Sequence, residues 1–267
     1  MKKFVFILVI GFLYFHAGAQ QEDFYSKLTK KADIAFSTHE YFKALNLYKD
    51  NLKESQNKYE KAYIQFRIAE CYRYINDVVK AEASYLKAIQ KGYHEPIAIL
   101  YYADMLKINE KYADAANQYK EYLKYKPDDQ YAQMGYKSCS MAAEWMEYPT
   151  RYVIENKKEL NSKEGDFAAA FANEDYTNVY FTSSRVGSHG EKINPVTGTI
   201  FTDIFESTFN KKNQWEKPVS ISDTVNSAND DGTPAFTNNF NELYFTRCHI
   251  VRGIKLGCKI YKATRPA

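Results

Sequence analysis

The sequence predicts an α + β protein with two domains, a solenoid of helical hairpins followed by a region of short β-strands. Two observations carry this prediction. In the first half of the chain, Ala44, Ala81 and Ala115 mark a pattern with a period of about 34 residues, which indicates stacked helical hairpins. From Tyr148-Pro149 onward, Ala-rich helical sequence gives way to Thr, Asn, Gly and alternating aromatics, which favour strands and turns.

The helical pattern reads aromatic or apolar residue, two residues, Ala, three residues, Tyr. It occurs at Tyr41–Tyr48, Val78–Tyr85 and Tyr112–Tyr119, and the alanine spacings are 81 − 44 = 37 and 115 − 81 = 34. Another alanine stands twelve residues before each of these: Ala32, Ala69 and Ala103. Small residues at both places let the two helices of a hairpin approach closely, as in the tetratricopeptide repeat (TPR).

Three TPR-like units are therefore expected at about 25–58, 62–95 and 96–129, with a capping helix at about 130–146. A generic helical bundle is the alternative. The 34-residue interval favours the repeat, and so does Pro127, which falls where the last unit should end its second helix.

In TPR register, the inner face of the first helices should form a groove for a peptide or protein partner. The expected groove positions are Tyr63, Phe66, Glu70, Arg73, Tyr74, Ile97, Leu100, Asp104, Lys107 and Ile108. Aromatic and Arg side chains among mixed charges are typical of such surfaces. The alternative is that several of these residues pack against the next repeat. The Lys/Asn set that clamps a C-terminal carboxylate is absent, which argues against capture of chaperone tails.

The second region is expected to be all-β and to contain a repeat. The expected strands are Arg151–Glu155, Phe167–Phe171, Asn178–Ser183, Thr202–Thr208, Thr233–Phe236, Glu242–Thr246 and Cys258–Ala263, with a linking strand within Asn213–Ile221. The segment from Gly165 to Ser183 is echoed from Gly232 to Thr246. The order of a Gly-led strand, a Tyr-Phe-Thr strand, an Ile-aromatic strand and a Trp strand describes one four-stranded propeller blade.

The first 19 residues are typical of a secretory signal peptide, with basic Lys2-Lys3, apolar Phe4–Phe15 and the cleavage site Ala17-Gly18-Ala19. The expected domains are then 20–147 and 148–267. An uncleaved membrane anchor is the alternative, although the apolar segment is short for a span. Removing the two lysines lowers the formal net charge from +3 to +1, which gives no electrostatic reason to bind nucleic acid.

We predict no catalytic residue, no cofactor and no metal site. The S-x-x-K match at Ser55–Lys58 lies between helical repeats without the partner motifs of that chemistry. The run Asn229–Gly232 lacks the spaced ligands of a Ca²⁺ loop and is expected to be a turn. The five histidines have no metal-ligand spacing.

Export makes disulfides permissible, and Cys248 and Cys258 are predicted to form one. They flank a connection that contains Gly253 and Gly257, so antiparallel strands would place the two cysteines opposite each other. The alternative is that they point to opposite faces. Cys71 and Cys139, two repeats apart, are expected to be buried free thiols.

Several motifs of the second region resemble a known family. They are Thr182–Arg185, Asp203–Phe205, Trp215–Pro218, Val225–Ser227 and Asp231–Pro234. With the preceding signal peptide and TPR units, they resemble the TolB-type WD40-like propeller proteins of the OmpA family in Bacteroidota, which include the periplasmic PorE component of type IX secretion. The resemblance implies a TPR-like α-solenoid followed by a WD40-like β-propeller.

The resemblance also implies a non-catalytic scaffold in the periplasm, associated with the outer membrane and serving type IX secretion or gliding-type envelope machinery. Its partners would be envelope or outer-membrane proteins that bind through the TPR groove. A propeller needs at least four blades, whereas Tyr152–Ala267 has room for about two, so the propeller is expected to be incomplete. Peptidoglycan binding is expected only if an OmpA-like domain is supplied. The alternative function is the accessory portion of an exported hydrolase or peptidase.

Overall fold

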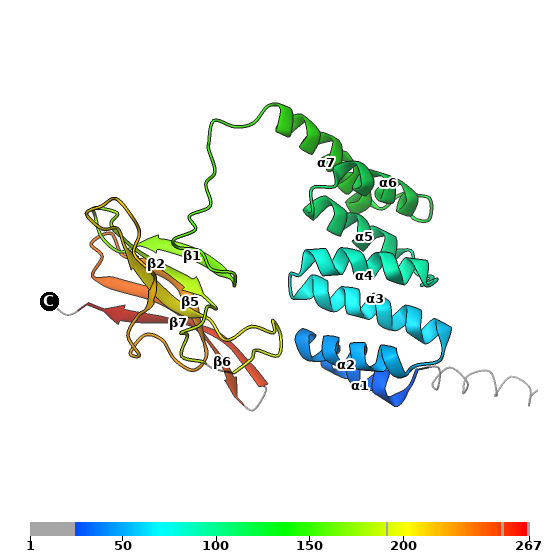
Figure 1. Ribbon diagram of the computed structural model, residues 1–267, viewed down its shortest axis with the longest axis horizontal. Coiled ribbons are helices and arrows are strands. Elements are labelled where there is room, and N and C mark those ends of the chain that lie inside the picture. The colour runs from blue at the N-terminus through cyan, green and yellow to red at the C-terminus, as the bar shows by residue number, and fades with distance from the viewer. Residues whose placement is uncertain (1–24, 191, 252–253, 266–267) are drawn as a thin grey trace, which may run out of the picture. The chain divides into compact units, whose positions relative to one another are not determined.

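The computed structural model describes residues 25–190, 192–251 and 254–265, so the expected signal peptide lies outside the described residues. The chain divides into two compact units. The first comprises residues 1–150 with 195–197, and the second comprises 151–194 with 198–267. Helices make up the first unit and antiparallel sheets the second, so the chain has the α + β composition that the sequence predicts (Figure 1).

Within the described residues the helical unit contains seven helices, which follow one another along a stack (Figure 1). Their bounds are α1 Lys27–Ser37, α2 Tyr41–Glu54, α3 Lys58–Tyr74, α4 Val78–Gln90, α5 Ile97–Ile108, α6 Tyr112–Leu123 and α7 Gln130–Glu147. Side chains of Ser26, Asn57, Asp77 and Asp129 accept hydrogen bonds from the first turns of α1, α3, α4 and α7. The helices pair as α1–α2, α3–α4 and α5–α6, as the repeat spacing predicts.

Alanine and tyrosine hold each hairpin together. Six alanines are fully buried at the helix contacts: Ala32, Ala44, Ala69, Ala81, Ala103 and Ala115. Tyr48, Tyr85 and Tyr119 are fully buried beside them. The expectation that small residues allow close helix approach is confirmed, and the space around them is filled by one large ring in each hairpin.

The turn inside each hairpin needs a residue in the left-handed region. His39, Asn76 and Glu110 all have φ of 62°, and they separate the two helices of successive hairpins. Their spacings, 76 − 39 = 37 and 110 − 76 = 34, repeat those of the alanines. The three turns are therefore structural copies, although the sequence uses a different residue at each.

Helix α7 covers the last hairpin. Gly135 faces the ring of Tyr119 so closely that a Cβ atom there would lie 2.6 Å from the ring carbons. Ala132 and Cys139 are buried in the same cluster, while Trp145 near the end of the helix is exposed. The predicted capping helix is present, and glycine sets its distance from the hairpin.

The second unit contains two antiparallel sheets within the described residues. The first has the order β1-β2-β3-β4 and the second the order β5-β6-β7. The strands are β1 Asp166–Phe171, β2 Asn178–Ser183, β3 Asp203–Thr208, β4 Val219–Ser220, β5 Asp230–Phe236, β6 Glu242–Val251 and β7 Ile254–Thr264. Ile204 of the first sheet lies in one apolar cluster with Leu243 and Phe245 of the second. The two sheets do not close into a ring, and no propeller is formed by the described residues.

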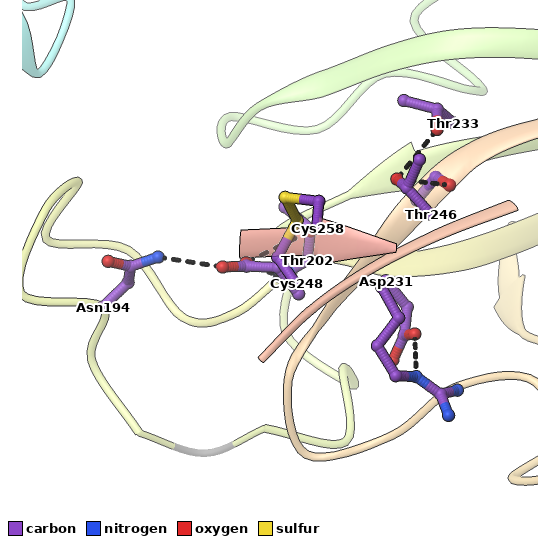
Figure 2. The surroundings of a disulfide bond; sticks show 10 residues. Asn194, Thr202, Asp231, Thr233, Thr246, Cys248 and Cys258 are labelled. Atoms are coloured by element: carbon purple, nitrogen blue, oxygen red, sulfur yellow. Dashed lines mark hydrogen bonds and ion pairs between the residues drawn. A yellow bond between two sulfur atoms is a disulfide. The ribbon is translucent and has the colours of Figure 1, made fainter. Parts of the chain in front are cut away.

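The two sheets are structural copies of each other. Equivalent residues of their first strands, Asp166 and Asp231, are 231 − 166 = 65 positions apart in the sequence. Asp166 accepts from the backbone and hydroxyl of Ser162, and Asp231 accepts in the same way from Ser227. Each aspartate also pairs with an arginine: Arg185 holds Asp166, and Arg247 holds Asp231 at 2.6 Å (Figure 2). Ala168 and Thr233 share a bulge and φ values of 53° and 52°. The internal β repeat is therefore confirmed, although Gly232 corresponds to Phe167 and not to Gly165 as the sequence comparison suggested.

Two expected strands differ from the structure. Of the linking strand within Asn213–Ile221, only β4 forms, with Trp215 joining Phe209 as an isolated bridge. The expected strand Arg151–Glu155 is wrong for the isolated chain, because these residues pair with no strand among those described.

The cysteines lie where the sequence places them. Cys248 and Cys258 are direct partners in the β6–β7 register, joined by a disulfide with a Cα–Cα distance of 3.9 Å (Figure 2). Cys71 and Cys139 are buried free thiols.

Candidate protein-binding face of the helical unit

Each helical hairpin contains one hydrogen bond between an acid on its first helix and a tyrosine on its second. The pairs are Asp33–Tyr48, Glu70–Tyr85 and Asp104–Tyr119, and in every pair the tyrosine hydroxyl donates to the carboxylate. The two residues are 15 positions apart in all three. A buried carboxylate needs such a donor, so the pairs lock the hairpins and fix the position of each acid.

Burial keeps these tyrosines in their donor form. It raises the pKa of Tyr48, Tyr85 and Tyr119, and the neighbouring carboxylate raises it further in the case of Tyr85. Burial also raises the pKa of Asp104, against the opposing effect of the hydrogen bonds it accepts from Tyr119 and Tyr131. The carboxylates of Asp33, Glu70 and Asp104 therefore each accept a hydrogen bond from within the helical unit.

Arginine side chains lie against the first two acid–tyrosine pairs. The Nε of Arg67 donates to the Tyr48 hydroxyl at 3.1 Å, and its guanidinium lies 3.6 Å from the Phe36 ring centroid. Arg73 contacts Glu70 at 3.0 Å through Nη2 and donates through Nε to the Tyr85 hydroxyl at 3.0 Å. These arginines are held by charge, hydrogen bond and ring contact together.

Arg73 also contacts two aromatic rings, one exposed and one half-buried. Its guanidinium lies 4.5 Å from the ring centroid of Tyr74 and 4.3 Å from that of Tyr101, on the next hairpin. On α5, Asp104 lies one helical turn before Ile108. The Asp104 carboxylate accepts a hydrogen bond at 3.1 Å from the hydroxyl of Tyr131, which lies on α7. We call the surface made by Arg73, Tyr74, Tyr101, Lys107, Ile108 and Tyr131 the α3–α7 face.

Three members of the α3–α7 face are large and exposed. Tyr74 is 46% exposed, Ile108 57% and Tyr131 58%. Tyr74 is nevertheless ordered by a ring stacked on Tyr41 at 4.4 Å between centroids. Rigid aromatic side chains beside an oriented arginine are the residue types that dominate binding energy at protein interfaces.

The structure divides the predicted groove residues into two groups. Tyr74 and Ile108 are exposed at the surface, and four others are half-buried: Tyr63, Arg73, Ile97 and Lys107. The others are buried: Phe66, Glu70, Leu100 and Asp104. Phe66 stacks on Tyr93 at 4.3 Å and Leu100 packs in the core of the last hairpin, so the packing alternative holds for both.

A small cavity of about 100 Å³ lies at the other end of α3. It is lined by Tyr25, Tyr59, Ala62, Tyr63, Gly92, Tyr93 and His94. The volume is below that of a typical ligand pocket and fits a single small side chain. The cavity is therefore suited to one residue of a bound peptide rather than to a cofactor.

Sequence reasoning missed four residues of this region: Asp33, Arg67, Tyr101 and Tyr131. A signal for Asp33 was present, because the acid-to-tyrosine spacing of 15 recurs in all three hairpins. Tyr101 and Tyr131 carry no comparable repeat signal, since their position depends on how α5 and α7 pack.

The second unit offers a polar cluster that is not arranged for catalysis. His189 Nδ1 contacts Asp203 at 2.6 Å and Nε2 contacts Asp223 at 2.7 Å. These hydrogen bonds raise the pKa of His189, and burial raises the pKa of Asp203. Ser220 lies 3.4 Å from the same Nδ1, but both ring nitrogens are already bound to carboxylates. No basic nitrogen is left to activate that hydroxyl.

A larger cavity of about 370 Å³ in the second unit is lined by polar and apolar residues, among them Tyr180, Glu206 and Arg265. Burial, with the Glu206 carboxylate, raises the pKa of Tyr180. Across the described ranges, no group of three or more His, Cys, Asp or Glu side chains is placed to hold a metal ion. No helix in the described part of the chain is long and apolar enough to cross a membrane.

Comparison with known proteins finds a likeness among solved structures but none among sequences. No family model matches the sequence, and no curated protein matches it. Among solved structures, the chain is similar to the C-terminal TPR-containing domain of a Plasmodium falciparum FK506-binding protein. The sequence identity is 16% and the TM-score 0.39, over 45% of this chain and 89% of that domain.

Proposed function

We propose that this protein is an exported, non-catalytic scaffold that binds an envelope or outer-membrane protein through the α3–α7 face. The carrying observation is the exposed Tyr74 beside Arg73, continued by Ile108 and Tyr131, on a frame whose buried acids are already paired. Side chains held in place before binding lose little entropy on association, which favours specific capture of a partner.

The resemblance to OmpA-family proteins of Bacteroidota supports a place in type IX secretion or gliding-type machinery. In this proposal the sheets β1–β4 and β5–β7 are two blades of a WD40-like propeller. The four-stranded antiparallel order of the first sheet and the recurrence of its Ser–Asp–Arg contacts in the second support that assignment. Peptidoglycan binding is not part of the proposal.

The binding test uses two exposed residues, Tyr74 and Ile108, rather than a direct partner of a buried acid. Arg73 is unsuitable, because its loss would also uncover buried Glu70. Instead, Tyr74→Ala with Ile108→Ala should weaken capture of the native partner from a cross-linked envelope extract by about 10-fold or more, with the fold unchanged. The matched control is Tyr125→Ala with Leu86→Ala, which also removes an exposed tyrosine and an exposed aliphatic side chain. Equal capture by both variants would refute the assignment.

Export has its own test. The mature protein recovered from the periplasm should begin at Gln20, and a retained Met1 would contradict a cleaved signal. The alternative function, an accessory portion of an exported hydrolase or peptidase, would be favoured by a hydrolase domain in the adjacent reading frame. An OmpA-like domain in that place would favour the scaffold.

A further inference from the structure

Helix α7 is the last helix of the stack (Figure 1), and it carries an apolar stripe in addition to the side that packs on the last hairpin. The packed side holds Ala132, Gly135 and Cys139, which are buried. Alternating steps of four and three positions separate the residues of the second stripe, which we call the outer stripe: Met134, Ser138, Met141 and Trp145. Such steps keep side chains on one face of a helix and are the spacing of a coiled-coil seam.

The outer stripe is open to solvent at both ends. Met134 is 71% exposed and Trp145 is 61% exposed, while Met141 between them is half-buried. Ser138, the polar member of the stripe, donates its hydroxyl hydrogen to Gly135 O at 2.8 Å within the helix. Another apolar surface can therefore cover the stripe without leaving that hydroxyl donor unpaired.

Two opposite charges flank the outer stripe along one of its sides. Lys137 and Glu144 each come one position before a stripe residue, and both are exposed. Seven positions separate them, so they lie two helical turns apart. Neither has an opposite charge three or four positions away on α7, and neither forms an ion pair with another residue that the structure describes. Their side chains are therefore available to a partner that presents the opposite charges at the same spacing.

We propose that the outer stripe pairs with the outer stripe of a second copy of this chain, with the two α7 helices antiparallel about a two-fold axis. The axis passes between positions 139 and 140, so Met134 lies opposite the partner subunit's Trp145, and Ser138 lies opposite the partner subunit's Met141. Each of these contacts occurs twice by symmetry. A thioether against an indole is a favourable contact, and the small side chain of Ser138 leaves room for a methionine.

Charge complementarity selects both the occupant and its orientation. In the antiparallel pair, Lys137 lies beside the partner subunit's Glu144, and Glu144 lies beside the partner subunit's Lys137, so every flanking charge is paired. A parallel pair would leave these charges beside Ala142 and Pro149, which carry none. Because the surface is its own complement, the contact closes as a dimer and does not propagate. One 18-residue helix from each copy makes a small interface, so the dimer should dissociate on dilution.

The first experiment is sedimentation velocity of the purified mature chain over a wide concentration range. The wild type should change from monomer to dimer as the concentration rises, and to nothing larger. Lys137→Glu should weaken the dimer about 10-fold or more, because both symmetric charge pairs become repulsive, and Glu144→Lys should do the same. The matched control is Lys31→Glu, the same change of charge at an exposed site on α1, which should dimerise like the wild type.

The second experiment mixes the two charge variants in equal amounts. Lys137→Glu has two negative flanking charges and Glu144→Lys has two positive ones, so a mixed pair regains both attractive contacts and should form a 1:1 dimer with about the wild-type affinity. Trp145→Ala should weaken the dimer about 10-fold or more in every mixture, because it removes an apolar contact. Circular dichroism verifies the helix content of each variant. A wild type that stays monomeric, a Lys137→Glu variant that dimerises normally, or a mixture no more dimeric than its components would each overturn the proposal.

Discussion

The two units are both built from repeats, but they place the key polar contact differently. In the helical unit the contact lies inside each hairpin, as when Tyr85 donates to Glu70. In the β unit Asn226 reaches from one repeat to the backbone of the previous one. A repeat with an internal contact is complete at both ends of an array, and α7 covers the last one. A contact between repeats forms only when both repeats are folded, so the stability of the β unit should depend more on its few buried ion pairs and its disulfide.

The largest expected effect is on the β unit. Asp231→Ala should lower its free energy of unfolding by about 3–5 kcal/mol, because Arg247 would remain largely buried without its partner. Denaturation followed separately for helix and sheet content should show only the sheet transition moving. The surface pair offers the control, since Glu242→Ala removes an exposed partner of Lys262 and should change little. A shift of both transitions would mean that the units unfold together.

Removing the disulfide should have the next largest effect. Cys248→Ser with Cys258→Ser should destabilise the β unit by about 2–3 kcal/mol, because a short loop is no longer closed in the unfolded chain. The control replaces the buried thiol Cys71 by alanine, which should affect the helical transition instead. Reduction of the wild type with dithiothreitol should reproduce the double variant. If it leaves the sheet transition in place, the bond is dispensable.

Sequence periodicity predicted what depends on local spacing. The hairpins, their alanines, the strands around Tyr180 and Tyr244 and the cysteine pair all follow from patterns within one repeat. It failed where a residue's role depends on a neighbour in space. Glu70 and Asp104 were expected on an open groove, yet tyrosines from the second helices bury and satisfy them. Arg151–Glu155 has the composition of a strand but pairs with no strand among the residues that the structure describes.

A smaller effect is expected in the helical unit. Tyr85→Phe removes the hydroxyl that donates to Glu70 and accepts from Arg73, and should cost about 1–2 kcal/mol in the helical transition alone. Tyr125→Phe, at an exposed site, is the control and should be neutral. Because the contact is internal to one hairpin, the neighbouring hairpins should keep their hydrogen-exchange protection. Loss of protection throughout the array would show that the hairpins are not independent.

The β unit should also respond to pH through His189. Its pKa is raised by Asp203 and then Asp223, so its contribution to stability is complete below the unfolded value of about 6.5 and is lost as pH rises through the folded value. Asp203, whose pKa burial raises, acts in the same direction. The urea concentration at the midpoint of the sheet transition should therefore decrease as the pH is raised above about 6.5. The variant His189→Gln should show a weaker pH dependence of this midpoint. An unchanged dependence would mean that another group causes it.

The smallest effect concerns the hairpin turns. Glu110→Asn should stabilise the helical unit by about 0.5–1 kcal/mol, because asparagine tolerates φ near 62° better than glutamate. The reverse change, Asn76→Glu, should cost a similar amount at the equivalent turn. Thermal midpoints that move in the same direction for both variants would contradict a backbone origin.

The chain's two tryptophans are divided between the units, and this has an optical consequence. Trp145 lies exposed near the end of α7, and Trp215 packs edge-on against Phe209 with 5.1 Å between ring centroids. An indole in water fluoresces at a longer wavelength than one packed against another ring. The fluorescence spectrum of the native protein should therefore be the sum of a longer-wavelength component from Trp145 and a shorter-wavelength component from Trp215. Trp145→Phe and Trp215→Phe would each leave one tryptophan. The unfolding of either unit could then be followed by the wavelength of tryptophan fluorescence without any added label.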